Sequence, residues 1–124
     1  MRHVVLTCSV LGASLLLPRL VAAEQAAPAP SLKCDIGPVT KVYGASQWLV
    51  YSCDDSRTVV VVSAPGSPAF PFYFTLSPTA SGYRLSGEGT GKKEATAAAL
   101  NELSKLSGRE IASLIEQTKP HQKQ

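Results

Sequence analysis

The sequence has 124 residues, of which 44% are hydrophobic and 6% aromatic, and its formal net charge is +3. This length suits one domain, and the composition argues against both a disordered chain and a multi-span membrane protein. Arg2 and Arg19 lie in a predicted export signal, so the remaining ten basic and nine acidic residues leave a net charge of +1. So small a charge excludes a strong electrostatic case for binding nucleic acid or an acidic substrate.

The first 23 residues have the features of a cleavable export signal. Residues 1–3 give a basic start, residues 4–17 are mostly apolar, and residues 21–23 (VAA) offer the small side chains that signal peptidase requires. A transmembrane anchor is the alternative, but the apolar run is shorter than the roughly 18 residues needed to span hydrocarbon. We therefore predict a signal peptide over 1–23, a periplasmic or secreted location, and no membrane span after its removal.

The cysteines predict one disulfide. Cys8 lies in the signal, which leaves Cys34 and Cys53 as the pair of the mature chain. A redox-active or metal-binding pair is the alternative, but the spacing is far from C-x-x-C and no histidine lies nearby. A bond that closes a loop of roughly 20 residues stabilises a small exported domain by about 3 kcal/mol.

The mature chain divides into a linker, one domain and a tail. Residues 24–33 are rich in alanine and proline and too poor in large apolar side chains to be ordered by packing. Residues 34–118 carry the regular patterns of a folded domain, and residues 119–124 form a polar tail. The domain is near the lower size limit for one hydrophobic core.

Turn residues recur at short intervals between residues 37 and 89, with β-favouring runs between them. Short turns join antiparallel neighbours, so the runs predict a β-meander of four to five strands. The expected strands are 39–43, 48–53, 58–63, 70–76 and 83–87. Residues 59–62 (VVVV) do not alternate with polar residues, which indicates a central strand.

The fourth expected strand has one strongly apolar face, which we expect to lie in the core. Pro71 cannot donate to a strand ladder, so it marks an edge, a strand start or a bulge. Tyr73 lies on the opposite face. The expected core face consists of Phe70, Phe72, Phe74 and Leu76.

Two helices are expected after the strands. Residues 92–106 are rich in helix formers, and a capping box at Ser107 and Glu110 opens a second helix over 108–118. Strands followed by helices predict an α+β fold with both helices on one face of the sheet. The expected apolar stripes are Ala95, Ala99, Leu103 and Leu106 in the first helix and Ile111, Leu114 and Ile115 in the second.

Residues 87–93 (GEGTGKK) lie between a strand and a helix, where glycine-rich turns can bind an anion. The segment is not a P-loop, because Ser86 stands at the first glycine position and Lys93 at the Ser/Thr position. The alternative is a tight strand-to-helix turn without a ligand. The candidate anion-binding residues are Gly89, Gly91 and Lys92.

No catalytic set is visible in the sequence. The one histidine outside the signal is His121, in the polar tail, which removes the usual base for a serine or cysteine nucleophile. Asp54, Asp55 and Glu88 could serve a small carboxylate-dependent hydrolase, but an Asp-Asp-Ser run is typical of a hairpin turn. We expect no cofactor and no metal site.

The strand aromatics suggest a binding surface instead. A sheet covered by helices on one side leaves some of them outward, where aromatic side chains form surfaces for a protein or glycan partner. Packing against the linker or the valine strand is the alternative. We therefore expect a non-enzymatic exported binding or accessory protein that acts through a sheet face. The candidate surface consists of Trp48, Tyr51, Tyr73 and Tyr83.

Overall fold

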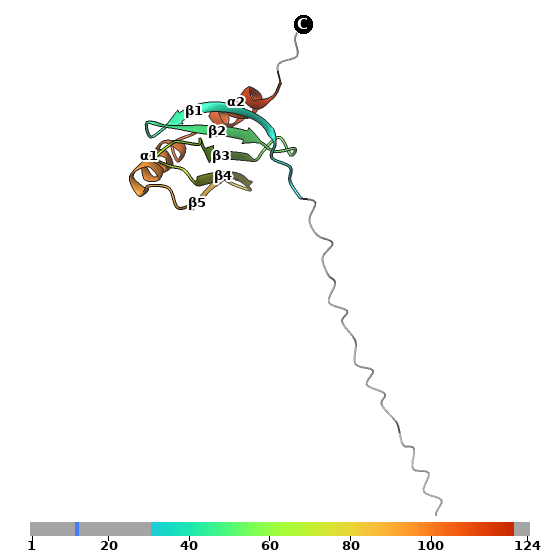
Figure 1. The fold of residues 1–124 in the computed structure, drawn as a ribbon. Coiled ribbons are helices and arrows are strands. Elements are labelled where there is room, and N and C mark those ends of the chain that lie inside the picture. The colour runs from blue at the N-terminus through green and yellow to red at the C-terminus, as the bar shows by residue number, and fades with distance from the viewer. Residues whose placement is uncertain (1–11, 13–30, 121–124) are drawn as a thin grey trace, which may run out of the picture.

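A computed structural model describes residue 12 and residues 31–120, and it confirms the α+β fold (Figure 1). Five antiparallel strands follow one another in chain order across a single sheet, and two helices complete the chain. The predicted signal peptide and most of the predicted linker lie outside the described residues. The elements are β1 (Ile36–Tyr43), β2 (Ser46–Ser52), β3 (Val59–Ser63), β4 (Phe72–Thr79), β5 (Gly82–Gly89), α1 (Lys93–Leu103) and α2 (Gly108–Thr118).

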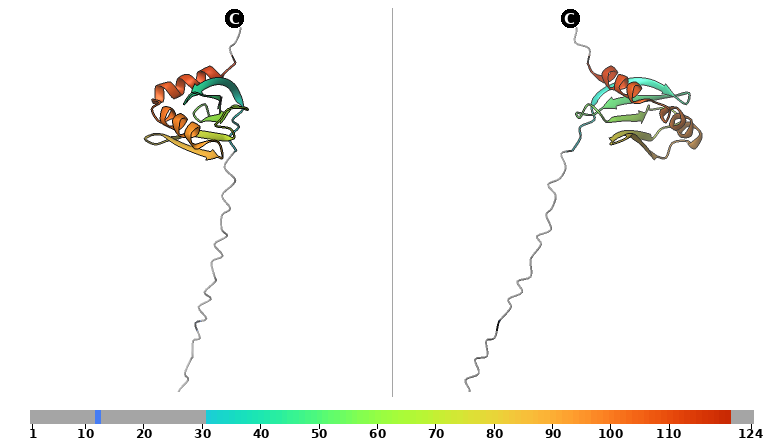
Figure 2. Two further views of the ribbon diagram at one scale, coloured as in Figure 1. Left: turned by 60° about the vertical axis from the view of Figure 1, so that its left-hand side comes forward. Right: turned by 180° about the vertical axis from the view of Figure 1, so that it is seen from behind.

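Both helices lie on the same side of the sheet, as the two views in Figure 2 show. The side chains that alternate toward them are buried, because each strand points every second residue to one face. The valine strand β3 is central, as predicted: Val59 and Val61 are fully buried, and Val60 and Val62 are half-buried on the other face. The core consists mainly of Trp48, Val50, Val59, Val61, Phe74, Leu76, Ala99, Leu103, Ile111 and Ile115.

The aromatic face of β4 packs toward the helices, as predicted, with one correction. Phe74 is 1% exposed and its ring lies 5.2 Å from that of Trp48 and 4.9 Å from that of Phe72. Phe70 was expected in this row but is half-exposed and precedes the strand. Pro71 explains the difference, because it has no N–H for a ladder and the strand begins only after it.

The hairpin between β4 and β5 is tighter than expected. The expected strands 70–76 and 83–87 leave residues 77–82 between them, but β4 continues to Thr79 and β5 starts at Gly82. Only Ala80 and Ser81 lie between the paired ends. The two strands therefore pair over eight residues each, without a shift in register.

The first helix packs closely on the turn between β1 and β2. Gly44 has a φ of +61°, and a β-carbon there would lie 2.5 Å from the backbone nitrogen of Ala99. Only glycine permits this approach together with this backbone conformation. The helix ends at Leu103 rather than at 106, while α2 has the predicted bounds and Ser107 accepts the Glu110 amide proton at 3.1 Å.

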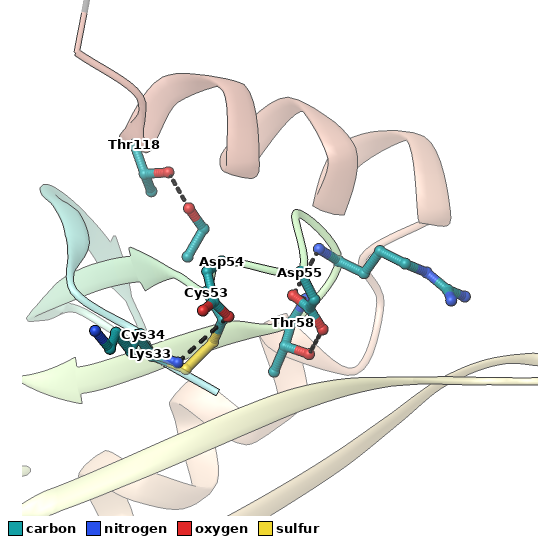
Figure 3. Close-up of a disulfide and its surroundings, with 9 residues drawn as sticks. Lys33, Cys34, Cys53, Asp54, Asp55, Thr58 and Thr118 are labelled. Carbon is teal, nitrogen blue, oxygen red and sulfur yellow. Dashed lines mark hydrogen bonds between the residues drawn. A yellow bond between two sulfur atoms is a disulfide. The ribbon is translucent and has the colours of Figure 1, made fainter. Parts of the chain in front are cut away.

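The disulfide between Cys34 and Cys53 is confirmed, and it joins the start of the domain to the end of β2 (Figure 3). Next to it, the Asp54 amide donates to the Lys33 carbonyl at 2.8 Å. At the same end of the sheet, Ser52 and Thr118 share a buried hydroxyl–hydroxyl contact of 2.6 Å. The first and last segments of the domain are thus both fixed to β2.

Candidate functional site

The face of the sheet opposite the helices has no described segment packed on it. Its middle is apolar, because β2, β3 and β4 present hydrophobic or aromatic side chains to both sides. Leu49 pairs with Val62, and Val62 pairs with Tyr73, so the three form one row across the strands. We call this surface the open face; it consists of Leu49, Tyr51, Val60, Val62, Tyr73 and Thr75.

A groove of about 520 Å³ borders the open face at the start of β4. Two large side chains at the groove are well exposed: Phe70 by 50% and Tyr73 by 42%. The volume of the groove falls in the usual range for ligand pockets, roughly 300–1,000 Å³. The lining is predominantly apolar and is formed by Val62, Ser63, Phe70, Pro71, Phe72, Tyr73, Glu88, Gly89 and Thr90.

The one charged group at the groove is Glu88. The Tyr73 hydroxyl donates to its carboxylate at 2.6 Å, across a directly paired position of β4 and β5. This hydrogen bond, together with the repulsion that a phenolate would meet from Glu88, raises the pKa of Tyr73 above its ordinary value. Tyr73 therefore stays protonated at neutral pH and orients one carboxylate oxygen of Glu88.

The backbone around the groove is held by hydrogen bonds. The buried Ser63 hydroxyl accepts the Phe72 amide proton at 2.9 Å and donates to the Phe72 carbonyl at 3.0 Å. The amides of Thr90 and Gly91 both donate to the Pro71 carbonyl, at 2.9 and 3.1 Å. These bonds fix the segment that carries Phe70, so this aromatic side chain is presented from an ordered support.

The four predicted surface aromatics do not share one face. Tyr51 and Tyr73 belong to the open face, but Tyr83 lies on the helix side and packs against the core. Trp48 corrects the prediction most clearly, since it is 0% exposed and its indole N–H donates to the Tyr43 carbonyl at 3.0 Å. The signal present in the sequence is that Trp48 and Tyr51, three residues apart in one strand, lie on opposite faces and cannot share one surface.

Sequence reasoning missed Leu49 and Phe70 as surface residues. Leu49 follows from the same alternation of β2, since it is in phase with Tyr51. The exposure of Phe70 could have been predicted from Pro71, because Pro71 has no N–H to donate and the hydrogen-bond ladder of the strand therefore does not include Phe70.

Two amides of the glycine-rich segment, those of the candidate residues Gly91 and Lys92, are occupied. Gly91 donates to Pro71, and the Lys92 amide donates to the Pro68 carbonyl at 3.0 Å. A β-carbon at Gly91 would meet the backbone of Ala69. The glycines therefore allow the β5–α1 connection to pass close to the 68–71 segment, and in this conformation these amides do not point at a vacant anion site.

The acidic pair after β2 is built into a turn (Figure 3). Asp55 accepts from the Arg57 and Thr58 amides at 2.9 and 2.8 Å and from the Thr58 hydroxyl. Burial alone would raise the pKa of Asp55, but the hydrogen bonds from Thr58 and Arg57 and the charge of Arg57 outweigh it and lower that pKa.

Glu88 does not join the acidic pair. It lies in the row of Val62 and Tyr73, whereas Asp54 and Asp55 follow the opposite end of β2. The three carboxylates thus do not meet in one cleft. Within residues 31–120, His, Cys, Asp and Glu form no group of three that could hold a metal ion.

No protein-family model, no curated protein and no solved structure matches this chain. None of the helices in the described part of the chain is long and apolar enough to cross a membrane.

Proposed function

We propose that this protein is an exported, non-enzymatic binding protein that works in an oxidising compartment and uses the open face as its contact surface. The observation that carries the proposal is the groove at Phe70 and Tyr73. Two exposed aromatic side chains stand beside a single carboxylate there, on a backbone held by internal hydrogen bonds. Rigid aromatic anchors of this kind contribute most of the binding energy of many protein interfaces.

A protein segment is the ligand class that fits the groove best. The apolar lining favours a hydrophobic side chain, and the rim carries the negative charge of Glu88. A partner with an apolar residue next to a lysine or arginine would bury the first against Phe70 and pair the second with Glu88. The neighbouring row of Leu49, Val62 and Tyr73 would extend the contact across the sheet.

The compartment is inferred from two features. The disulfide between Cys34 and Cys53 persists only where thiols are not kept reduced. The sequence of residues 1–23 adds the pattern of an export signal. Together they favour a periplasmic or secreted protein.

Affinity capture with two matched variants tests the proposal. The full chain is immobilised as wild type, as Phe70→Ser and as Leu100→Ser, and exposed to extract from the compartment. Leu100 is the control because it is an apolar side chain of similar exposure, 44%, on α1 rather than on the open face. Loss of the exposed Phe70 ring, which the partner would cover, should weaken retention of the partner on the order of tenfold, while Leu100→Ser should leave it unchanged.

Two other results would overturn the proposal. If the protein binds glycans in a panel, Phe70→Ser abolishes this binding and no protein partner is captured, the ligand is a glycan and not a protein. Turnover of a hydrolase substrate that Asp55→Asn abolishes would replace the function itself.

A further inference from the structure

The two edges of the sheet differ in how well they are protected from pairing with another strand. At one edge, β1 contains Pro38, which has no N–H, and its register with β2 shifts between Ile36 and Val39. Prolines and bulges of this kind discourage edge-to-edge pairing. At the other edge, β5 has eight residues, no proline and no shift in register, and within the described residues no second strand pairs with it.

We propose that β5 pairs antiparallel with β5 of a second copy of this chain, about a two-fold axis through Ser86. The strand is self-complementary in this one register. Residue 84 then lies opposite residue 88 of the second copy, residue 85 opposite 87, and residue 83 opposite 89. The segment of β5 reads Gly82, Tyr83, Arg84, Leu85, Ser86, Gly87, Glu88 and Gly89.

Charge selects the register. Arg84 and Glu88 are both exposed and point to the open-face side of β5. The axis through Ser86 places Arg84 opposite Glu88 of the second copy, and symmetry repeats the pair. An axis through Arg84 or through Glu88 would instead place like charges opposite each other, which destabilises a cross-strand pair. An axis through Leu85 or Gly87 would leave both charges without a cross-strand partner.

Side-chain size agrees with the same register on the helix side. Leu85 lies opposite Gly87 of the second copy, and Tyr83 lies opposite its Gly89. The rings of Phe72 and Phe74 lie over these two glycines, so the two large side chains would pack against those rings. A hollow of about 270 Å³ adjoins Gly87, between the β4 aromatics and α1, where Leu85 of the second copy can extend. The helices pack on β1 and β2 rather than on β5, which leaves Tyr83 and Leu85 only half-buried in the single chain.

The alternation of hydrogen-bonded and non-hydrogen-bonded residues along β5 is also compatible with this register. A two-residue hairpin loop closes on a hydrogen-bonded pair, here Thr79 and Gly82, and bonded pairs alternate along the ladder. The backbone groups of Tyr83, Leu85, Gly87 and Gly89 are therefore directed away from β4. The axis through Ser86 pairs these residues with one another and sets Ser86 opposite its own copy at a non-hydrogen-bonded position. The result is a sheet of ten strands with the two open faces on the same side.

Charge reversal tests this arrangement by sedimentation velocity over a range of protein concentrations. Wild type should dimerise, and Arg84→Glu or Glu88→Arg alone should raise the dimer dissociation constant on the order of tenfold, because each creates two like-charge pairs. The double swap R84E/E88R should restore it. Arg109→Glu, an exposed reversal in α2, should have no effect. Loss of the Tyr73–Glu88 bond cannot explain restoration in the double swap, since that variant lacks the bond too.

A disulfide cross-link tests the axis itself. In the full chain with Cys8→Ser, Ser86→Cys should form an oxidised dimer, because opposed non-hydrogen-bonded residues have α-carbons about 4.5 Å apart, within disulfide range. Thr40→Cys, on the other edge strand, should not. A wild type that stays monomeric at all concentrations, single reversals that leave dimerisation unchanged, or cross-linking through Thr40→Cys would each overturn the proposal. None of these results bears on whether Phe70 binds a partner.

Discussion

The hydroxyl of Ser52, at the end of β2, donates its proton to the hydroxyl of Thr118, 66 positions further along the chain at the end of α2. The direction follows from the second contact of Thr118, whose single proton goes to the Ile115 carbonyl at 2.6 Å. Both side chains are buried. The last turn of α2 is therefore fixed to the last residue of β2, directly before the disulfide-bonded Cys53.

This direction predicts unequal effects of removing the two hydroxyls. Thr118→Val leaves the buried Ser52 donor without an acceptor and should cost about 1–3 kcal/mol of unfolding free energy. Ser52→Ala leaves only an acceptor unpaired and should cost about 1 kcal/mol. Urea unfolding of both variants and of the double variant measures this, and the double variant should lose less than the sum. Equal single losses that add would contradict the assignment of the donor.

The orientation of the sheet predicts a sharp contrast between neighbours on β4. Phe74 is buried between the rings of Trp48 and Phe72, so Phe74→Ala should cost about 3–5 kcal/mol. Tyr73 lies on the open face, and Tyr73→Ala should cost about 1 kcal/mol or less. Phe72→Ala, at a half-buried position, should fall between the two. Denaturant midpoints for the three variants would contradict the orientation if Tyr73 proved the most damaging.

The turn around Asp55 predicts a loss of stability in acid. Its pKa is lower in the folded protein than in the unfolded chain, so its contribution is present above the ordinary aspartate pKa of about 4 and is lost as the pH falls through the folded value. Asp55→Asn should be less stable than wild type at pH 7, and the difference should shrink as the pH falls from neutrality to below about 4. Thermal unfolding across this range measures it; a difference independent of pH would contradict the ionised role.

The contact between α1 and the β1–β2 turn predicts that Gly44 does not tolerate a side chain. Gly44→Ala combines a positive φ with a clash against Ala99 and should cost about 2–4 kcal/mol. Gly66→Ala is the matched control, since Gly66 also has a positive φ, of +85°, but its β-carbon would meet nothing within 4 Å. Its cost should be only the backbone part, about 1–2 kcal/mol. Equal losses at both glycines would show that the helix contact contributes nothing.

The fold could be predicted from the sequence because its local signals agree. The turn residues, the uninterrupted valines of β3, the alanine-rich helix and the Ser107 cap all favour the same architecture. Pro78 misled the prediction, since proline is a turn signal in sequence but lies within β4, opposite Tyr83, at the end of the hairpin.

The site was harder to predict, because the exposure of a strand side chain depends on which face of the sheet it points to and on which segments pack against that face. Trp48 and Tyr51 were assigned to one surface, although the alternation of β2 places them on opposite faces of the sheet. Both alternating sets of β2 are apolar, so the sequence does not say which set is buried. The groove at Phe70 depends on the 68–71 segment passing next to residues 89–92, which are far away in sequence. Such a contact between distant segments leaves no periodic pattern to read.

Photo-cross-linking tests the binding role of the open face most directly. A photoreactive phenylalanine analogue replaces Tyr73 on the open face or, as the matched control, Ala112 on the exposed side of α2, and both chains are expressed in the cells that make the protein. We expect irradiation to join the chain to a distinct protein partner through position 73 and not through position 112. Adducts through position 112 alone, equal adducts at both positions, or none at either would contradict the binding role of this face.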